Sequence, residues 1–340
     1  MAADIPVTVT AIDSLGRSGE DSVASADRRG YIDGTGIVKT GRWGRYEVLG
    51  QLGAGGMGIV FEARDPALHR KVALKLLQPR RNRSSADDDA RRLAAEAQAM
   101  ARLAHPNVVT VFEIDRVDDQ MYVAMELVSG TTLRGWLSER PRRWREIVQM
   151  FASAGRGLAA AHAAGLVHRD FKPDNVLIGS DGRPRVCDFG LVVDTIGDGE
   201  GEGELAELAE LHSDHTTRGS AVGTPAYMSV EQWTGQPVDA RSDQFAFCVA
   251  LWEALCRCRP FPGRQWREVR AAACSGAITE PQVGRRVPRW LLAMLRRGLS
   301  VDPQARWPSL EALIDALERR AAAGRRRTIA AIAAGVAIAS

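Results

Sequence analysis

The sequence predicts an α+β protein in two lobes, a small β-rich lobe followed by a larger and mainly helical one. Short runs of β-branched and aromatic residues, typical of strands, crowd residues 46–127. After Gly130 the apolar residues instead recur at helical spacing, first over residues 144–164. With 340 residues, 45% of them hydrophobic, the chain is long enough to bury a core in both lobes.

The small lobe is expected to contain five strands and one helix. The strands are predicted at residues 46–52, 59–64, 72–77, 108–114 and 121–127. The helix begins near Ser84, which can cap it, and three aspartates in its first turn suit the helix dipole. Glu96 lies in the apolar stripe of this helix, and a carboxylate that faces inward requires a cationic partner.

The larger lobe is expected to contain further helices. They are predicted at residues 244–257, 266–273, 290–299 and 310–320. The two lobes, residues 43–127 and 128–320, would meet at residues 126–130, and a cleft between lobes is a usual place for a ligand. Residues 1–42 are rich in Gly, Ser, Asp and Arg without any period, so we predict a disordered N-terminal extension.

The C-terminal residues 321–340 form a basic and then apolar segment. Three arginines, Arg325 to Arg327, precede a mostly apolar run over residues 328–340. A membrane-spanning helix needs roughly 20 apolar residues, so this run is either a hydrophobic tail or the first half of such a helix. Basic residues before a membrane helix favour the cytoplasm for the preceding domain. We therefore expect a cytoplasmic domain that could be anchored to the inner membrane.

A glycine-rich turn and a nearby lysine could bind phosphate. Gly53, Gly55 and Gly58 would let backbone amides approach phosphate oxygens, although the pattern also fits an ordinary hairpin turn. A strand rather than a helix follows Gly58, which argues against a dinucleotide-binding fold. Lys75 lies inside an apolar strand, where it is either an exposed edge residue or a buried cation with a purpose. An ion pair with Glu96 would position this lysine for phosphate.

One loop concentrates polar groups between apolar runs, which is typical of a functional site rather than a core. Its members are His168, Asp170, Lys172, Asp174 and Asn175. Asp188 follows 13 residues after Asn175. Hard oxygen ligands such as these two side chains suit Mg²⁺, which usually takes one or two protein ligands together with substrate phosphates.

Together these residues resemble the signature set of the eukaryotic-type protein kinases. A glycine loop, a Val-Ala-x-Lys strand, a His-Arg-Asp loop with its Asn, and Asp-Phe-Gly occur in the order of that family. The resemblance runs from about residue 46 to residue 320. Gly55-Gly-Met-Gly58 and the Gly-Thr-Pro-x-Tyr-Met segment at residues 223–228 most resemble the bacterial serine/threonine kinases. The resemblance implies a two-lobed kinase fold and transfer of the ATP γ-phosphoryl group to Ser or Thr of proteins.

The resemblance also implies a role for each matching residue. Asp170 would orient the substrate hydroxyl, and Lys172 would neutralise the transferring phosphoryl group. Asn175 and Asp188 would hold Mg²⁺. Lys75, held by Glu96, would bind the α- and β-phosphates of ATP. The other nucleotide-binding positions are Leu52, Gly53, Gly55, Gly58, Val60, Ala73, Met125, Glu126, Val128, Leu177 and again Asp188.

Further family features concern the catalytic loop and the segment after Asp-Phe-Gly. Asp243 resembles the buried helix aspartate that braces the catalytic loop. Ser229-Val-Glu231 stands where the family usually has Ala-Pro-Glu, and the retained Glu231 is expected to pair with Arg306. Losing the proline should loosen this turn without removing any catalytic atom.

The segment between Asp-Phe-Gly and Gly223 carries candidate regulatory residues. Thr216 or Thr217 is predicted to be autophosphorylated, because a phosphate there could pair with Arg169 and order the segment. Residues 198–210 are rich in carboxylates and carry no basic residue. We interpret them as a solvated loop, and a short amphipathic helix for a partner is the alternative.

Several other functions are less consistent with the sequence. A pseudokinase that binds ATP without efficient transfer is the main alternative, but every catalytic position is filled. A small-molecule phosphotransferase should lack Lys172 and the Gly-Thr-Pro segment, and Lys172 also disfavours a tyrosine kinase. The net charge is only +3 and no basic run is interleaved with a series of aromatics, so a nucleic-acid partner is not expected. Protein substrates are the expected partners, and the chain could form a homodimer through the small lobes.

Overall fold

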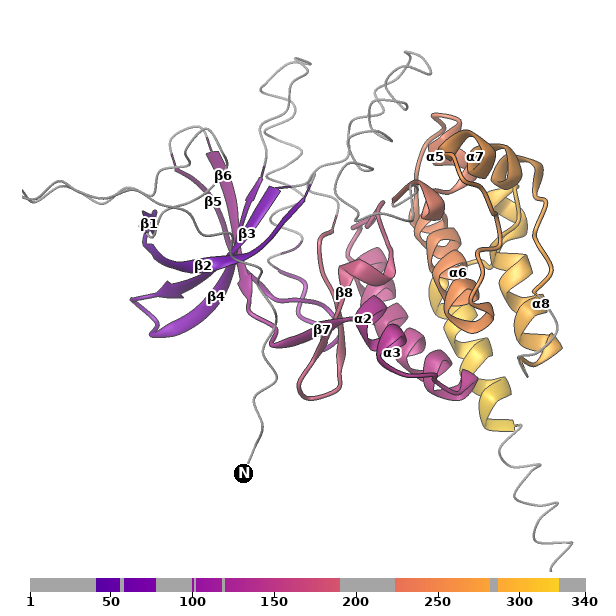
Figure 1. Cartoon of the computed structure of the whole chain (residues 1–340), viewed down its shortest axis with the longest axis horizontal. Coiled ribbons are helices and arrows are strands. Elements are labelled where there is room, and N and C mark those ends of the chain that lie inside the picture. The colour runs from indigo at the N-terminus through magenta and orange to yellow at the C-terminus, as the bar shows by residue number, and fades with distance from the viewer. Residues whose placement is uncertain are drawn as a thin grey trace, which may run out of the picture.

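The computed structural model describes residues 41–55, 58–77, 100, 102–117, 120–189, 224–281 and 287–323. Figure 1 shows a small lobe of strands on one side and a larger lobe of helices on the other, with β7 and β8 between them. The predicted α+β class and its division into two lobes are therefore confirmed.

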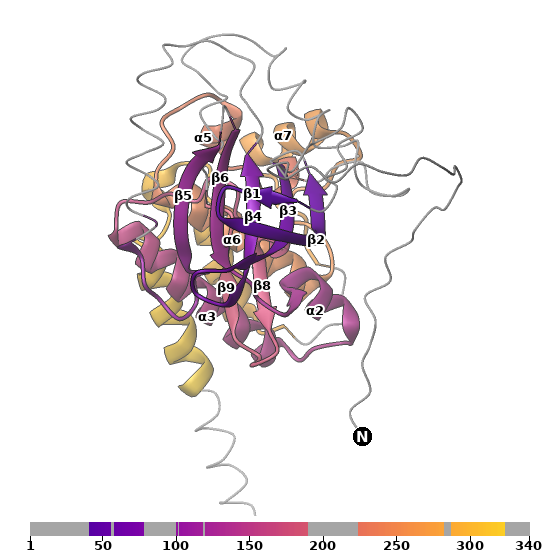
Figure 2. The ribbon, with the colours of Figure 1, turned by 90° about the vertical axis from the view of Figure 1, so that its left-hand side faces the viewer.

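The small lobe is built on one six-stranded antiparallel sheet, seen face on in Figure 2. Its strands are β1 (Arg42–Trp43), β2 (Tyr46–Gly55), β3 (Gly58–Asp65), β4 (Arg70–Leu77), β5 (Val111–Val117) and β6 (Gln120–Glu126), in the order β1-β2-β3-β4-β6-β5. Successive side chains of a strand point to opposite faces. On β4, Val72, Leu74 and Leu76 pack into a core within the small lobe, whereas Ala73 and Leu77 pack into the core that continues into the larger lobe. Lys75 shares the face of these last two residues.

One predicted strand was displaced. The sequence predicted a strand at residues 108–114, but β5 covers Val111–Val117. Val108 and Val109 instead contact Val186 of the larger lobe, where the backbone N–H of Val109 donates to the Val186 carbonyl at 2.9 Å. The apolar character of these two valines thus reflects a contact between lobes rather than membership of the sheet.

The larger lobe combines a small sheet with a set of helices. Its elements are β7 (Gly130–Thr132), α2 (Leu133–Glu139), α3 (Trp144–Ala163), η1 (Pro173–Asn175), β8 (Val176–Gly179), β9 (Pro184–Val186), η2 (Thr224–Tyr227), α5 (Val230–Trp233), α6 (Ala240–Cys256), α7 (Trp266–Ser275), α8 (Arg289–Gly298), η3 (Pro303–Ala305) and a helical stretch over residues 310–323. The predicted helices of this lobe are present within a few residues of their expected bounds.

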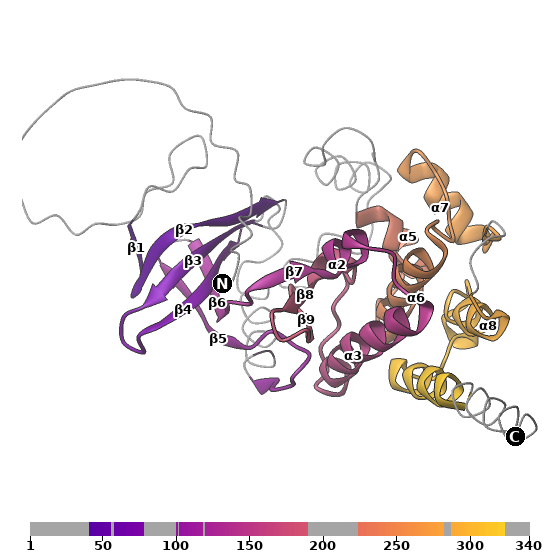
Figure 3. The ribbon, with the colours of Figure 1, turned by 60° about the horizontal axis from the view of Figure 1, so that its bottom comes forward.

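Helix α6 is the centre of the larger lobe. Every residue from Ser242 to Trp252 is buried, and a helix that is buried all round belongs to the core. It packs against α3 and α8, between which it lies in Figure 3. Polar side chains on such a helix are therefore fixed in position, which is relevant for Asp243.

The close approach of α3 to the lobe junction depends on Gly157. A Cβ atom at this position would lie 2.2 Å from the carbonyl oxygen of Asn107, which accepts the backbone N–H of Val186 at 2.9 Å. We expect Gly157→Ala to lower the free energy of unfolding by about 1–3 kcal/mol, the usual cost of overpacking. Chemical denaturation measures this. Gly50→Ala is the control, because nothing lies within 4 Å of its Cβ position, and an equal loss in both variants would contradict the packing argument.

Within the parts of the chain that the structure describes, no helix is long and apolar enough to cross a membrane. The apolar run at residues 328–340, the helix expected near Ser84 with Glu96, the acidic residues 198–210, and Thr216 and Thr217 all lie outside the described residues.

Candidate active site

The carboxylate of Asp243 anchors the loop between α3 and β8 through hydrogen bonds. The Asp243 carboxylate accepts the backbone N–H groups of His168 and Arg169, each at 2.7 Å. His162 of α3 contacts the same carboxylate through Nε2 at 2.8 Å. Arg169 has φ 65°, in the left-handed region, so these contacts stabilise a backbone conformation that is unfavourable for a non-glycine residue. The expected bracing of this loop by Asp243 is confirmed.

The two oxygens of the Asp170 carboxylate have different surroundings. Its Oδ2 accepts Lys172 Nζ at 2.8 Å and Asn175 Nδ2 at 3.1 Å. Its Oδ1 is buried and has no hydrogen-bond partner among the residues that the structure describes. The Asn175 amide also donates to the Asp170 carbonyl at 2.8 Å, which ties the two residues together. One oxygen is thus fixed by protein donors, and the other can accept a hydrogen bond from a ligand.

Lys75 is a buried cation paired with Asp188. Its ammonium lies 2.9 Å from Asp188 Oδ1, and only 7% of its side chain is exposed. The strand β4 that carries it lies inside the sheet between β3 and β6, so the edge-residue interpretation was wrong. A buried charge needs a partner, and within the described residues that partner is Asp188. Because Glu96 lies outside the described residues, the Lys75–Glu96 pair stays a prediction.

Apolar residues from both lobes share one core. Ala73 and Met125, on the neighbouring strands β4 and β6, are buried in the core that spans the two lobes. Val60 of β3, Val128 and Leu177 of β8 are partly buried and pack against this core. The predicted adenine-binding residues are therefore all part of, or packed against, the core that extends from the small lobe into the larger one.

The glycine-rich turn is the meeting point of β2 and β3. Gly55 pairs with Gly58, and the exposed Leu52 and Gly53 precede them on β2. Gly58 has φ +131°, and a Cβ there would lie 2.0 Å from the Leu76 carbonyl oxygen. Only glycine therefore fits at this position. The turn carries no bulky side chain between Leu52 and Ile59 among its described residues.

The two polar loops are joined through His168. Its Nε2 lies 2.9 Å from the Cys187 carbonyl oxygen, and its ring contacts Phe189 with centroids 4.8 Å apart. Asp188, between these two residues, has φ 60° and is thereby turned toward Lys75. Burial raises the pKa of the Cys187 thiol well above its ordinary value, so this cysteine remains a neutral packing residue.

Asn175 and Asp188 form a donor set that fits Mg²⁺. The Asn175 amide nitrogen is engaged by Asp170, which leaves its carbonyl oxygen as the atom available to a cation. The Asp188 carboxylate is 27% exposed and supplies a second hard oxygen ligand. Among the described residues there is no group of three or more His, Cys, Asp or Glu that could hold a metal. One or two oxygen ligands are what Mg²⁺ usually takes from a protein when phosphates complete its coordination.

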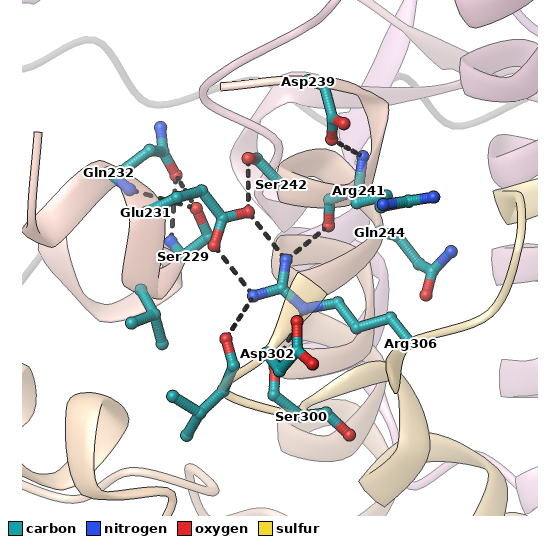
Figure 4. Close-up of polar contacts among 12 residues, drawn as sticks. Ser229, Glu231, Gln232, Asp239, Arg241, Ser242, Gln244, Ser300, Asp302 and Arg306 are labelled. Carbon is teal, nitrogen blue, oxygen red and sulfur yellow. Dashed lines mark hydrogen bonds and ion pairs between the residues drawn. The ribbon is translucent and has the colours of Figure 1, made fainter. Parts of the chain in front are cut away.

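The turn that begins α5 is anchored by Glu231 and Arg306, shown in Figure 4. Arg306 Nη1 and Nη2 bind the two Glu231 oxygens at 2.7 and 2.8 Å, and Ser242 Oγ donates to Glu231 at 2.5 Å. Both charged side chains are almost completely buried, with 0% and 4% of their surfaces exposed. The predicted Glu231–Arg306 pair is confirmed.

Sequence reasoning missed Gln232, which links this turn to the catalytic loop. Ser229 caps α5, and its backbone N–H donates to Gln232 Oε1 at 2.9 Å in a capping box. The Gln232 amide donates to the Arg169 carbonyl at 2.7 Å. The Ser-x-x-Gln spacing at residues 229–232 was the available signal. The capping box stabilises the turn at Ser229-Val-Glu231, which lacks the proline usual in the family.

Comparison with known proteins identifies the family. The family model described as protein kinase domain matches residues 46–316, most of the chain. This chain belongs to the protein kinase family. The curated relatives place this kinase with the bacterial serine/threonine kinases of eukaryotic type.

Three relatives and one solved structure illustrate the similarity. Serine/threonine-protein kinase PknD of Mycobacterium tuberculosis (strain CDC 1551 / Oshkosh) is 33% identical over 79% of this chain and 38% of its own. PknE of Mycobacterium bovis is 34% identical over 81% and 46%, and the DNA damage-responsive kinase RqkA of Deinococcus radiodurans is 35% identical over 77% and 38%. The crystal structure of the Mycobacterium tuberculosis PknI kinase domain matches with 25% identity and a TM-score of 0.60, over 82% of this chain and 97% of that domain. This kinase thus spans less than half the length of these curated relatives.

Proposed function

We propose that this kinase transfers the γ-phosphoryl group of ATP to serine or threonine hydroxyls of proteins, including its own. The observation that carries the proposal is the divided Asp170 carboxylate. Lys172 and Asn175 fix one oxygen, and the other is buried without a partner among the described residues. A carboxylate held in this way can accept a hydrogen bond from a substrate hydroxyl and orient it toward a phosphoryl group.

The surrounding residues have complementary roles in this proposal. Val60, Ala73 and Leu177 enclose the adenine, and the backbone from Glu126 to Val128 binds its polar edge. Leu52, Gly53, Gly55 and Gly58 cover the phosphates from the side of the small lobe.

Cations then offset the phosphate charge. Lys75 binds the α- and β-phosphates, and Lys172 neutralises charge on the transferring group. Asn175 and Asp188 hold Mg²⁺, which when bound neutralises charge that develops on the phosphates. Asp188, which lies 2.9 Å from the Lys75 ammonium, would supply one oxygen ligand to the cation.

The proposal is tested by incubating the protein with γ-labelled ATP, Mg²⁺ and an unstructured protein rich in serine and threonine. We expect acid-stable label on serine and threonine, and no labelling when EDTA is present from the start to remove the metal. Mass spectrometry of the kinase itself should find phosphate on Thr216 or Thr217. Protein that binds ATP but transfers no label would overturn the proposal in favour of a pseudokinase.

The domain organisation and assembly are further parts of the proposal. Residues 43–320 form the kinase domain in this proposal, although strand β1 (Arg42–Trp43) already pairs with β2, so the predicted N-terminal boundary at residue 42 lies slightly too late. The apolar run at residues 328–340 would contribute to a membrane anchor. The domain would lie in the cytoplasm at the inner membrane and could pair through its small lobes. Membrane fractionation tests the anchor, and a kinase found only in the soluble fraction would contradict it. Analytical ultracentrifugation tests the pairing, and a monomer would contradict that.

A further inference from the structure

A network of charged side chains lies directly beside the catalytic loop. Arg134, the second residue of α2, binds Asp174 with both ends of its guanidinium, Nε to Oδ1 and Nη2 to Oδ2 at 2.8 Å each. Its Nη2 also donates to Tyr227 Oη at 2.7 Å, and Tyr227 Oη donates to Glu253 Oε2 at 2.5 Å. One arginine therefore satisfies Asp174 directly and contacts Glu253 through a tyrosine.

The network is within reach of a substrate bound at Asp170. Asp174 precedes Asn175, whose amide contacts the Asp170 carboxylate at 3.1 Å. An extended peptide advances about 3.3 Å per residue, and Asp174 lies four residues from Asp170 in the same loop, so we take side chains two or three residues from the phosphoacceptor as those that would come near Asp174. The Asp174 side chain is 43% exposed and Arg134 is 41% exposed, so both are accessible from solvent. A basic substrate side chain would meet Asp174 here if Arg134 did not already bind it.

A pocket of about 450 Å³ adjoins the network. Its walls include Pro173 of the catalytic loop, Glu253, and the arginines Arg134, Arg142 and Arg257. Arg134 and Arg142 already pair with Asp174 and Glu139, and Glu253 pairs with Arg259, so the carboxylates in and around this pocket each have a cationic partner. Although burial alone would lower it, hydrogen bonds and charges from Asp174 and Tyr227 raise the pKa of Arg134, so the guanidinium stays charged.

We propose that Arg134 is a specificity-determining residue that occupies the carboxylate site of Asp174 and Glu253, so that the kinase prefers acidic or neutral residues over basic ones near the phosphoacceptor. This inference rests on the proposed function and adds the substrate class to it. A purely structural arginine would join α2 to the catalytic loop without affecting which peptides are used. The two roles therefore differ in substrate preference, which can be measured separately from activity.

The experiment compares peptides that share one serine acceptor and carry Lys, Ala or Glu at the two and three positions on either side of it. The ratio of kcat/KM for the Lys and Ala peptides is measured for the unsubstituted protein and for Arg134→Gln. We expect a Lys-to-Ala ratio of one or less for the unsubstituted protein. In Arg134→Gln the ratio should be about 10-fold higher, because the substrate lysine can then form one hydrogen bond to the freed Asp174 carboxylate. Arg140→Gln is the matched control, because Arg140 pairs with Glu146 at the surface and does not line the pocket.

A second variant tests whether the higher Lys-to-Ala ratio depends on the Asp174 carboxylate. In Arg134→Gln/Asp174→Asn the preference for the Lys peptide should fall back toward that of the unsubstituted protein. The inference is overturned if the unsubstituted protein prefers the Lys peptide, or if an Arg134→Gln protein that phosphorylates the Ala peptide shows an unchanged ratio. If Arg134→Gln does not fold, the unsubstituted protein still provides a test, because a Lys-to-Ala ratio of kcat/KM above one would overturn the inference. Absence of label on every peptide would instead refute the proposed function.

Discussion

Replacing Asp170 with Asn is expected to lower the rate of phosphoryl transfer by roughly 10²–10⁴-fold, the usual contribution of a positioned general base. The substitution keeps the shape of the side chain but removes its negative charge. Lys172 and Asn175, which now donate to Oδ2, lose an ionised acceptor. The unpartnered Oδ1 can no longer orient a hydroxyl as a carboxylate would. ATP binding should change little, because the nucleotide-binding residues are unaffected.

Single-turnover transfer of labelled phosphate measures this effect, and a separate fluorescence titration measures ATP affinity. Asp115→Asn is the matched control, since Asp115 is an exposed residue of β5 that hydrogen-bonds only to its neighbouring backbone among the contacts described for it. The control should retain the full rate. An Asp170→Asn protein that transfers phosphate as fast as the control would mean that Asp170 does not orient the acceptor.

The regular elements could be predicted from the sequence where one face is buried. Helix α3 buries Ile147, Phe151 and Leu158 at helical spacing, so its pattern is visible in the sequence. Helix α6 was predicted at residues 244–257 and begins four residues earlier, at Ala240, although it is buried on nearly all sides. Helix α2 was not predicted, because it has only seven residues and buries only Leu133. Its one local signal is the capping residue Thr132, whose side chain accepts the Gly135 N–H.

Two partnerships around the candidate site, Asp243 with the catalytic loop and Glu231 with Arg306, could be predicted, but the Lys75–Asp188 contact could not. Ordered motifs identified Lys75, Asp170, Asn175 and Asp188, because each chemistry needs a particular functional group. Which groups touch depends on strand register and on the left-handed turns at Arg169 and Asp188, which no local pattern specifies. The sequence therefore could not show that Lys75 lies 2.9 Å from Asp188.

The Arg134 network shows the same limit more clearly. Its members come from α2, η1, η2 and α6, and none of them has a sequence pattern that indicates the others. Only the folded larger lobe brings these four elements together. Features of substrate preference that arise in this way require the structure, whereas the reaction type can be inferred from the motifs.

Replacing Arg306 with Leu is expected to lower the free energy of unfolding by about 3–5 kcal/mol, the usual result of removing one partner of a buried ion pair. Glu231 would remain in the interior with Ser242 as its one other side-chain donor among the described contacts. The carbonyl oxygens of Arg241 and Ser300, which now accept from Arg306 at 2.9 Å, would also lose their donor. The exposed pair of Arg319 and Asp315, 3.8 Å apart, provides the control, and Arg319→Leu should cost less than about 1 kcal/mol.

The pH dependence of unfolding distinguishes this ion pair from simple packing. Burial alone would raise the pKa of Glu231, but Arg306 and Ser242 outweigh it and lower the pKa below its ordinary value. A carboxylate with a lowered pKa contributes stability above its unfolded pKa, and this contribution is lost as the pH falls through the folded value. The difference between the unsubstituted protein and Arg306→Leu, measured by urea unfolding, should therefore be largest at neutral pH and should narrow in acid. A difference that stays constant down to acidic pH would mean that Arg306 stabilises the lobe by packing on Phe245 and hydrogen bonding to the backbone, rather than through the charge of Glu231.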